Sequence, residues 1–327
     1  MTVLFLFIYS NLKYESCKLN CDEAVTDIQT QDTAQQIQLE PLVQPEVKTE
    51  TSINTENIML EMKRRELLVM DECHESGRFK VGHVLGNPKT LNVVSKMLID
   101  RNYEVAWCPV YKAGSSTWLY VFAAMGEILT PINLHKLNTG KTQINELARK
   151  AYPKAPVTRE RVELLSQITR FIIVRHPFER ILSAYRDKLE HRKNREFYYK
   201  KYGYEIQQEP TFEEFLKFIV KTKKFDEHWR PFYIECAPCE LNYQYILKME
   251  SLDTEQIYFA TKFNLLQFLP NITNSNPVGR THLDIAKNYY SQISKQLLGA
   301  VYLLYEMDFR LFDYSPQQYF DFARDGD

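Results

Sequence analysis

Two stretches of the chain repeat one pattern, and this pattern limits the folds that the chain can adopt. The first is a β-prone run, YEVAWCPVY (103–111), followed by a polar turn and the apolar helical segment TWLYVFAAMGEIL. The second is TRFIIVRHP (169–177), followed by the helical segment FERILSAYRDKLEHR. A strand, a turn and a helix that occur twice, with helical segments between them, are typical of a parallel sheet flanked by helices. We therefore predict an α/β fold.

The first turn, KAGSST, has the composition of a phosphate-binding loop. The first N–H groups of a helix have no partner within the helix, and the positive end of the helix dipole lies there, so the site attracts anions. Gly114 lets the backbone approach a ligand closely, Ser115, Ser116 and Thr117 add hydroxyl groups, and Lys112 adds a positive charge. The lysine precedes the glycine, whereas in a Walker A loop it follows the glycines. The alternative is a polar helix cap with an incidental lysine.

The second unit carries another candidate anion site. Arg175 lies at the end of the predicted strand, and Ser183 follows eight residues later, about two turns into the helix. An arginine fork and a hydroxyl group can together hold a terminal phosphate. The alternative is that Arg175 pairs with Glu179 or Asp187. Two anion sites at two strand ends indicate a ligand with a phosphate at each end.

The two motifs CPVYKAGSSTW and FIIVRHPFERILSAYR resemble the 5′-phosphosulfate loop and the 3′-phosphate motif of Golgi carbohydrate sulfotransferases. The likeness is to the group of chondroitin and dermatan 4-O-sulfotransferases and GalNAc-4-O-sulfotransferases. The stretches FDEHWRPFYIECAPCELNYQYILKMESL and LLGAVYLLYEMDFRLFDYS support it, so that it covers about residues 78–316. It implies a P-loop-like parallel sheet flanked by helices, the fold of the sulfotransferases that use 3′-phosphoadenosine-5′-phosphosulfate (PAPS). The implied reaction is sulfuryl transfer from PAPS, without a metal, to a hydroxyl of chondroitin, dermatan or a GalNAc-terminated carbohydrate.

The resemblance also implies a role for each motif residue. Lys112 would stabilise the leaving phosphate, and the loop that follows it would hold the 5′-phosphate. Arg175 and Ser183 would hold the 3′-phosphate. Arg280, in NPVGRTHLD, would close over the nucleotide, or is an ordinary surface arginine. The predicted donor-binding set is Lys112, Ala113, Gly114, Ser115, Ser116, Thr117, Trp118, Arg175, Ser183 and Arg280.

A histidine is the natural base for the acceptor hydroxyl, because its pKa is near neutral. His135, in PINLHKLN, lies between the two phosphate motifs, where related sulfotransferases keep a base. His228, in EHWRP, matches a family motif and precedes Trp229, which would stack on a sugar ring. We rank His135 first and His228 second, and expect His176 to pack or to cap a helix.

Two other functions stay open. A P-loop-like nucleotide kinase is disfavoured because Lys112 precedes the glycine and no Mg²⁺-binding Asp is evident at the end of the second strand. A catalytically silent glycan-binding relative is disfavoured by the intact Lys112, Arg175 and Ser183. The basic segment around residues 186–201 suits a polyanionic glycan or is a solvated helix face. No nucleic-acid-binding motif accompanies it, so we expect no nucleic-acid partner.

The N-terminal part differs in composition from the rest of the chain. Residues 1–9 are a short apolar segment, far below the roughly 20 residues that span a bilayer and without a basic flank. We read them as a degenerate signal-anchor; a marginal signal peptide and a buried segment are the alternatives. Residues 10–56 are rich in Gln, Thr, Glu and Asp and are predicted to be a disordered, low-complexity stem. Residues 57–327 would form the catalytic domain, on the lumenal side of the Golgi membrane, or free in the secretory lumen if the anchor is lost.

The cysteines and one glycosylation motif bear on the compartment. Cys236 and Cys239 form a C-x-x-C pair, which is weak evidence for zinc because a structural zinc site needs four ligands. A local or long-range disulfide in a secretory compartment is the favoured explanation. The triplet that begins at Asn271 is an acceptor for N-glycosylation.

Overall fold

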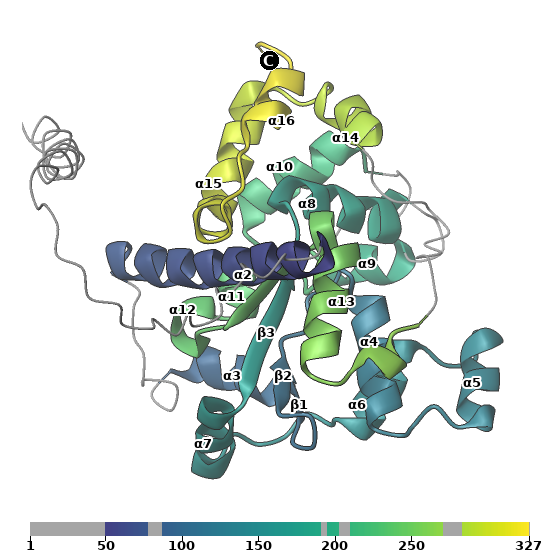
Figure 1. Cartoon of the computed structure of the whole chain (residues 1–327). Helices are drawn as coiled ribbons and strands as arrows, with labels where there is room; N and C mark the ends of the chain where they lie inside the picture. The colour runs from purple at the N-terminus through teal and green to yellow at the C-terminus, as the bar shows by residue number, and fades with distance from the viewer. Residues whose placement is uncertain (1–49, 78–86, 191–194, 203–209, 271–282, 327) are drawn as a thin grey trace, which may run out of the picture. The chain divides into compact units, whose positions relative to one another are not determined.

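One sheet organises the part of the chain that this computed structural model describes, which comprises residues 50–77, 87–190, 195–202, 210–270 and 283–326 (Figure 1). Its strands, in order across the sheet, are β1 (Leu98–Asp100), β2 (Val105–Trp107), β3 (Thr169–Val174) and β4 (Tyr245–Lys248). β1 pairs with β2 in antiparallel fashion, whereas β2, β3 and β4 are parallel. The mostly parallel sheet with helices around it confirms the predicted α/β fold.

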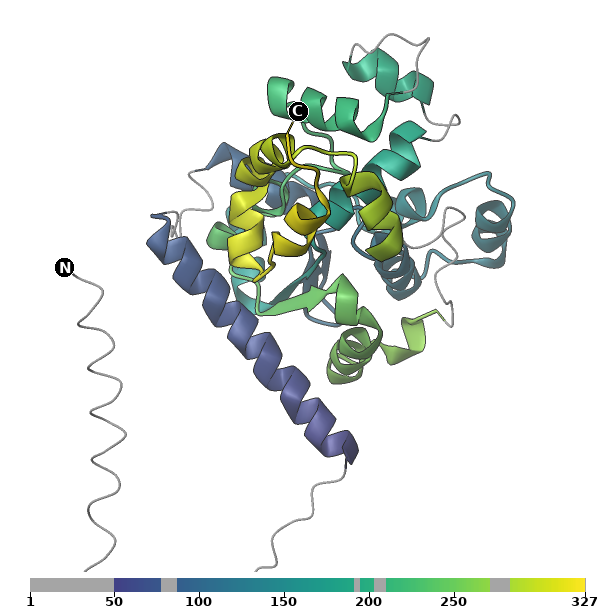
Figure 2. The same ribbon diagram turned by 90° about the horizontal axis from the view of Figure 1, so that it is seen from above.

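Helices precede, connect and follow the strands (Figures 1 and 2). The α-helices are α2 (Glu50–Glu75), α3 (Pro88–Lys96), α4 (Ser115–Met125), α5 (Pro131–Asn138), α6 (Ile144–Ala151), α7 (Arg159–Gln167), α8 (Pro177–Tyr185), α9 (Arg195–Tyr202), α10 (Phe212–Thr222), α11 (Phe232–Glu235), α12 (Pro238–Leu241), α13 (Leu252–Lys262), α14 (Leu283–Tyr290), α15 (Lys295–Leu311) and α16 (Gln317–Phe322). Three shorter turns are the π-helix η2 (Arg186–Glu190) and the 3₁₀ helices η4 (Met249–Ser251) and η5 (Leu266–Phe268). Among the described helices, none is both long and apolar enough to cross a membrane.

Burial of both sheet faces explains the continuous apolar sequence of β3. Phe171 and Ile173 lie in one hydrophobic cluster, whereas Ile172 and Val174 lie in another. Strands that are covered on both faces are typically apolar at every position rather than at every second one. On the first face, α4 packs its Trp118 ring edge-on against Phe171, with the ring centroids 4.8 Å apart. The core therefore fixes α4 relative to the strand that precedes α8.

α2 begins earlier than the sequence indicated. Its predicted extent is Ile58 to about Cys73, and the stem is predicted to reach residue 56, but the helix begins at Glu50. The buried Arg65 fastens α2 to the domain: its Nη2 lies 2.8 Å from a Glu255 oxygen on α13, and its Nη1 donates to the Ile246 carbonyl of β4. The predicted anchor (1–9) and most of the predicted stem (10–49) lie outside the described residues.

Two further helices have clear start signals. At α10, Thr211 Oγ1 accepts from the Glu214 N–H (3.2 Å) and a Glu214 oxygen accepts from the Thr211 N–H (2.7 Å), which confirms the predicted capping box. The C-terminal helix was expected over Ser291 to about Tyr305. It begins at Lys295, after Ser294 as N-cap, and extends to Leu311.

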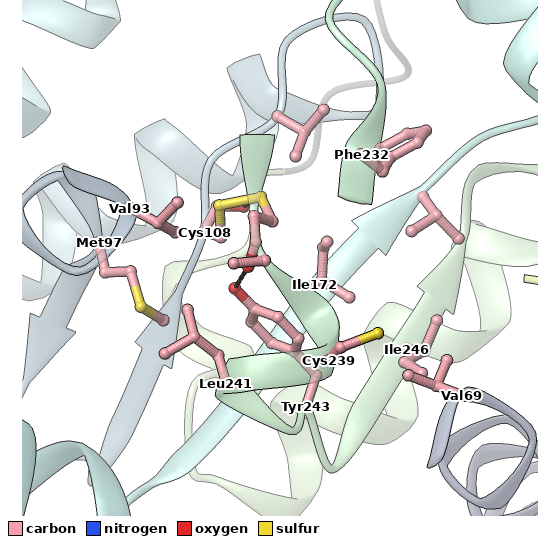
Figure 3. Packing of buried hydrophobic residues seen from close by; sticks show 14 of the residues in the cluster. Val69, Val93, Met97, Cys108, Ile172, Phe232, Cys239, Leu241, Tyr243 and Ile246 are labelled. Atoms are coloured by element: carbon pink, nitrogen blue, oxygen red, sulfur yellow. Dashed lines mark hydrogen bonds between the residues drawn. A yellow bond between two sulfur atoms is a disulfide. The ribbon is translucent and has the colours of Figure 1, made fainter. Parts of the chain in front are cut away.

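Two long-range disulfides join distant parts of the chain. Cys73 of α2 is bonded to Cys239 of α12, and Cys108, which follows β2, is bonded to Cys236. Figure 3 shows Cys108 and Cys239 in the apolar cluster beside the sheet, where the Tyr243 hydroxyl also donates to the Cys236 carbonyl (2.8 Å). Both cysteines of the C-x-x-C pair are therefore in disulfides, which confirms the disulfide interpretation over the zinc one.

We expect the double variant Cys73→Ala/Cys239→Ala to be less stable than the wild type by about 2–5 kcal/mol. The bonded residues are 166 positions apart in sequence, so the bridge restricts the unfolded chain strongly, whereas α2 is otherwise held mainly by side-chain contacts. Guanidinium titration followed by circular dichroism measures the difference. An unchanged unfolding midpoint would show that the bridge does not contribute to stability.

Candidate functional site

The loop between β2 and α4 has an unusual backbone. Lys112 and Gly114 both have left-handed geometry, with φ of 70°. Left-handed residues in such loops help successive N–H groups to form a concave site for anions. Gly114 is the N-cap of α4 and makes no side-chain capping bond, and the first turn of α4 contains no acidic residue. The beginning of α4 therefore has the features of an anion-binding helix N-terminus.

Gly114 packs tightly against the residues behind the loop. A Cβ atom at this position would lie 2.9 Å from Leu252 Cδ2 and 3.4 Å from Met249 Sδ. The left-handed φ is also unfavourable for any residue with a side chain. Only glycine therefore fits without displacing its neighbours.

Lys112 points toward the helix that follows β3. Its Nζ lies 3.1 Å from Asp187 Oδ2, and Lys188 Nζ lies at the same distance from that oxygen. Burial lowers the pKa of Lys112 below its ordinary value, and the Asp187 carboxylate opposes this effect. Burial would raise the pKa of Asp187, but the two lysines outweigh it and lower that pKa. Asp187 is thus a carboxylate that helps to keep the buried Lys112 charged.

Arg175 connects the end of β3 to the same loop. Its Nη1 donates to the Lys112 carbonyl at 3.3 Å, and its Nε and Nη2 each lie 3.2 Å from a Glu179 oxygen. The pairing with Glu179 was the alternative role for this arginine, and the structure shows it together with the contact to the loop. Ser183 is buried on α8, about one turn beyond Glu179. Lys112 and Arg175 therefore belong to one site at the ends of two neighbouring parallel strands.

The helix after β3 changes its geometry where Asp187 lies. The sequence predicted one continuous helix, but α8 ends at Tyr185 and residues Arg186–Glu190 form the π-helix η2. Such π-turns are rare and frequently occur at functional sites. Here the wider turn contains the carboxylate that pairs with Lys112.

A buried arginine joins this loop to a second loop. Arg180 Nε donates to the Tyr111 carbonyl (2.9 Å), while its Nη1 and Nη2 donate to the carbonyls of Arg230 (2.6 Å) and Glu227 (3.0 Å). The guanidinium is almost fully buried, with 1% of the residue exposed. Its three carbonyl acceptors fix residues 227–230 beside the residue that precedes Lys112.

His228 lies in this second loop as part of a buried pair. Its Nδ1 contacts Asp226 Oδ1, and the Tyr198 hydroxyl lies 3.3 Å from the same nitrogen. Its ring stacks on Tyr111, with the centroids 4.8 Å apart. Burial would raise the pKa of Asp226, but hydrogen bonds from His228 and Lys201 outweigh it, so that Asp226 is ionised. An ionised acceptor assigns the Nδ1 proton to the bond with Asp226 and leaves the Nε2 lone pair, with which no described residue forms a hydrogen bond, to accept a proton.

A model of the sulfotransferase family matches residues 95–315, more than half of the chain and the part that holds Lys112, Arg175, Ser183 and His228. The chain belongs to the sulfotransferase family.

The relatives of this sulfotransferase are named as carbohydrate sulfotransferases. Carbohydrate sulfotransferase 11 of Rattus norvegicus is 25% identical over 253 residues, which cover 70% of this chain and 70% of that protein. Carbohydrate sulfotransferase 8 of Homo sapiens is 27% identical over 249 residues, covering 68% and 56%. Carbohydrate sulfotransferase 10 of Xenopus laevis is 25% identical over 284 residues, covering 79% and 77%. These matches confirm the predicted resemblance. No solved structure matches the chain.

The three histidines considered in the sequence lie in different environments in this sulfotransferase. His135 is exposed on α5, which lies at the periphery in both views (Figures 1 and 2). His228 lies beside Tyr111, directly before the loop that holds Lys112. His176 packs, as expected: its ring stacks on Tyr319 with the centroids 4.5 Å apart.

The predicted stacking of Trp229 on a sugar ring is wrong, whereas Trp118, which was predicted in the donor-binding set, has its side chain on the apolar face of the predicted helix. Trp118 is fully buried in the core around Phe171, and Trp229 is 1% exposed and packs edge-on against Phe215. Both tryptophans follow motif residues in sequence, but their positions on the helix and loop turn them inward. Arg280 and Asn271 lie outside the described residues.

Sequence reasoning gave no site role to Asp226, Arg180 or Tyr111, and mentioned Asp187 only as a partner for Arg175. Asp226 precedes His228 by two residues, and this spacing allows a carboxylate to pair with the histidine. The sequence therefore contained an indication of this pair. Arg180 and Tyr111 carried no signal, because their contacts join segments that are far apart in the chain.

Proposed function

We propose that this sulfotransferase transfers the sulfuryl group of PAPS to a hydroxyl group of a glycan. The observation that carries the proposal is the placement of Lys112 and Arg175 in one site, at the start of α4. The names of the relatives support a carbohydrate as acceptor. The motifs favour chondroitin, dermatan or a GalNAc-terminated carbohydrate within that class.

The residues present fit the donor nucleotide. The beginning of α4 has no acidic residue and no side-chain cap that would compete with a 5′-phosphate. Gly114 allows the left-handed turn of the loop and its close packing against Leu252 and Met249. Arg175 and Ser183 are the residues that we assign to the 3′-phosphate. Arg175 already pairs with Glu179, so the proposed contact requires the guanidinium to share its donors.

Lys112 is the residue that we assign to stabilisation of the leaving group. When bound, PAPS supplies an activated sulfuryl group whose transfer leaves negative charge on a phosphate oxygen. A fixed positive charge that is aimed at this oxygen lowers the barrier, and it acts more strongly in a site that excludes water. The side chain of Lys112 is 15% exposed, and its Nζ lies 3.1 Å from Asp187 Oδ2. Asp187 therefore orients the ammonium group before the donor arrives.

His228 is the residue that we assign as the base. Burial lowers its pKa below 6.5, so the imidazole is neutral near pH 7 and can accept a proton. Asp226 fixes the ring so that Nε2 is the basic nitrogen. The ring of Tyr111 stacks on His228, and Tyr111 directly precedes Lys112 in the loop between β2 and α4. His135, in contrast, lies on a peripheral helix. These positions support His228 rather than His135 as the base in our proposal.

We also propose a place in the secretory lumen. Two disulfides hold this domain, and disulfides form and persist in oxidising compartments. This supports the predicted lumenal location, in or near the Golgi membrane. The reaction itself, as proposed, needs no metal.

A direct assay tests the function. Wild-type protein is mixed with radiolabelled PAPS and a panel of desulfated chondroitin, dermatan and GalNAc-terminated oligosaccharides. We expect label in at least one glycan, and stabilisation in a thermal shift by adenosine 3′,5′-bisphosphate without Mg²⁺. Stabilisation by Mg-ATP alone would support the kinase instead. Nucleotide binding with no transfer to any glycan would support a silent relative.

We expect Gly114→Ala to weaken the binding of adenosine 3′,5′-bisphosphate about tenfold or more, which corresponds to about 1.4 kcal/mol. The new methyl group would contact Leu252 at 2.9 Å, so the loop has to move. Gly140→Ala is the matched control, because φ there is 69° but no atom lies within 4 Å of the added Cβ. Calorimetry measures the affinity of each variant. Equal effects of the two substitutions would contradict a role for close packing at Gly114.

A further inference from the structure

A hollow with a volume of about 470 Å³ lies beside the pair of Asp226 and His228. Sites for small ligands typically have volumes of about 300–1,000 Å³. Asp226 lines the hollow, and its Oδ1 contacts His228 Nδ1, so the hollow borders the proposed base on the side of its carboxylate partner. The other lining residues are Lys96, Lys201, Lys224, Phe225, Glu227 and Arg230. None of these belongs to the predicted donor-binding set, so the hollow is available to the acceptor.

Three cations at the hollow have carboxylate partners. Lys201 Nζ lies 2.6 Å from Asp226 Oδ2. Arg230 Nη1 lies 2.5 Å from one oxygen of Glu235, and Lys96 Nζ lies 3.9 Å from the other. An ammonium group has three donors and a carboxylate has about four acceptor positions, so these pairs can also form hydrogen bonds with hydroxyl groups. A wall of this kind suits a ligand that is rich in hydroxyl groups.

Lys224 is the fourth cation at the hollow, and it is solvent-exposed. No carboxylate in the part of the chain that the structure describes forms an ion pair with it. Four cations meet three carboxylates, namely Asp226 and Glu227 in the wall and their neighbour Glu235, so one positive charge is in excess. A ligand with a single anionic group at this place balances that charge.

An exposed aromatic ring borders the same place. Phe197 on α9 is 63% exposed, and Lys201 Nζ lies 5.6 Å from the centroid of its ring. The ring also packs edge-on against Tyr198, whose hydroxyl lies 3.3 Å from His228 Nδ1. The C–H groups on one face of a sugar ring can pack against such an aromatic ring, which removes apolar surface from water. Phe197 is therefore a candidate stacking surface for a sugar.

We propose that the hollow binds an acidic saccharide unit of the acceptor glycan, adjacent to the unit that receives the sulfuryl group. Lys224 binds the carboxylate of this unit, because an unsulfated acidic glycan carries its charge on carboxylates. Phe197 packs against a ring of the same chain. The inference rests on the proposed function, and it favours the acidic acceptors chondroitin and dermatan over a neutral GalNAc-terminated carbohydrate.

The test compares Lys224→Met with the wild type by calorimetry, in the presence of saturating adenosine 3′,5′-bisphosphate. The two probes are an unsulfated chondroitin hexasaccharide and its carboxyl-reduced, neutral form. We expect Lys224→Met to bind the acidic probe about 5- to 20-fold more weakly, because it loses a charged hydrogen bond that solvent partly screens. Its affinity for the neutral probe should equal that of the wild type, and Lys224→Arg should recover most of the loss.

A second variant, Phe197→Ala, tests the stacking contact separately. We expect it to weaken the binding of both probes equally, by about three- to tenfold, because packing on an aromatic ring does not depend on the carboxylate. Two controls are matched to these variants. Lys221→Met removes a charge from an exposed lysine that does not line the hollow, and Ile132→Ala removes an exposed apolar side chain on α5. Neither control should change the affinity for either probe.

The proposal is wrong if the wild type does not bind the acidic probe, or if Lys224→Met and Lys221→Met bind it equally well. It is also wrong if Lys224→Met loses the same affinity for both probes, and unchanged binding by Phe197→Ala would overturn the stacking contact. Binding that depends on Lys224, without transfer to any glycan, would refute the proposed function alone. Transfer to a neutral glycan, with no effect of Lys224→Met on either probe, would refute this inference alone.

Discussion

A Lys112→Met variant is expected to transfer sulfuryl groups about 10²–10³-fold more slowly than the wild type while it still binds adenosine 3′,5′-bisphosphate. Methionine has a similar length and fills the same space, so the substitution removes the charge with little loss of packing. The start of α4 and Arg175 still hold the nucleotide in our proposal, whereas the leaving oxygen loses its counter-charge. Single-turnover assays with radiolabelled PAPS measure the rate, and calorimetry measures the affinity.

Lys188→Met is the comparison that shows whether the position of the charge matters. Lys188 Nζ lies 3.1 Å from the same Asp187 oxygen, but Lys188 belongs to η2 and not to the loop. We expect the turnover of Lys188→Met to stay within about tenfold of the wild type, because the charge of Lys188 is one of several around the site. If the two variants lose turnover equally, or if Lys112→Met keeps near-normal turnover, the assignment of Lys112 to the leaving group is wrong.

The parts of the site that the sequence predicted are those encoded by local patterns. β2 with the KAGSST turn, and β3 with Arg175, were predictable because each strand, turn and helix is continuous in the chain. The parallel pairing of β2 with β3 then brings the two turns together. The capping box at Thr211 was predictable for the same reason, since a cap depends on residues three positions apart.

The parts that could not be predicted depend on distant segments or on short ones. β1 and β4 have three and four residues, too few for a periodic pattern to be distinguished, whereas the equally short β2 lies in a longer β-prone run, residues 103–111. The disulfides join residues 166 and 128 positions apart, and several pairings of the cysteines were equally compatible with the sequence. The π-turn at Asp187 is recorded by no local pattern, whereas the burial of Trp118 agrees with its place in the predicted apolar helical segment.

Arg180 joins the loop that precedes Lys112 to the loop around His228. Its guanidinium donates to the carbonyls of Tyr111, Glu227 and Arg230, so it crosses from the loop before Lys112 to the loop around His228. Because no carboxylate in the described part of the chain forms a hydrogen bond with it, its hydrogen bonds go to the backbone of both loops. The distance between the proposed base and the proposed leaving-group lysine is thus fixed by the fold core rather than by the ligand.

The second large effect is expected for His228→Ala, which should reduce turnover by about 10²–10⁴-fold and leave nucleotide affinity intact. The loss follows from the removal of Nε2 as proton acceptor, since burial keeps the imidazole neutral and Asp226 orients it in the wild type. His135→Ala, on the exposed helix α5, is the matched control and should keep near-full turnover. A large loss in His135→Ala alone would restore the order suggested by the sequence. If both variants keep near-full turnover, neither histidine is the base.

The pH dependence of kcat/KM gives an independent check on the same histidine. A protonated imidazole cannot accept a proton, so activity should fall as pH falls through the pKa of His228. Burial lowers this pKa, so the midpoint of the acid limb should lie below 6.5. Asp226→Asn removes the carboxylate that opposes the shift, so the midpoint should move to still lower pH while turnover also falls, because the ring loses its orientation. A wild-type midpoint above 6.5, or an upward movement in Asp226→Asn, would mean that a group other than His228 controls the acid limb.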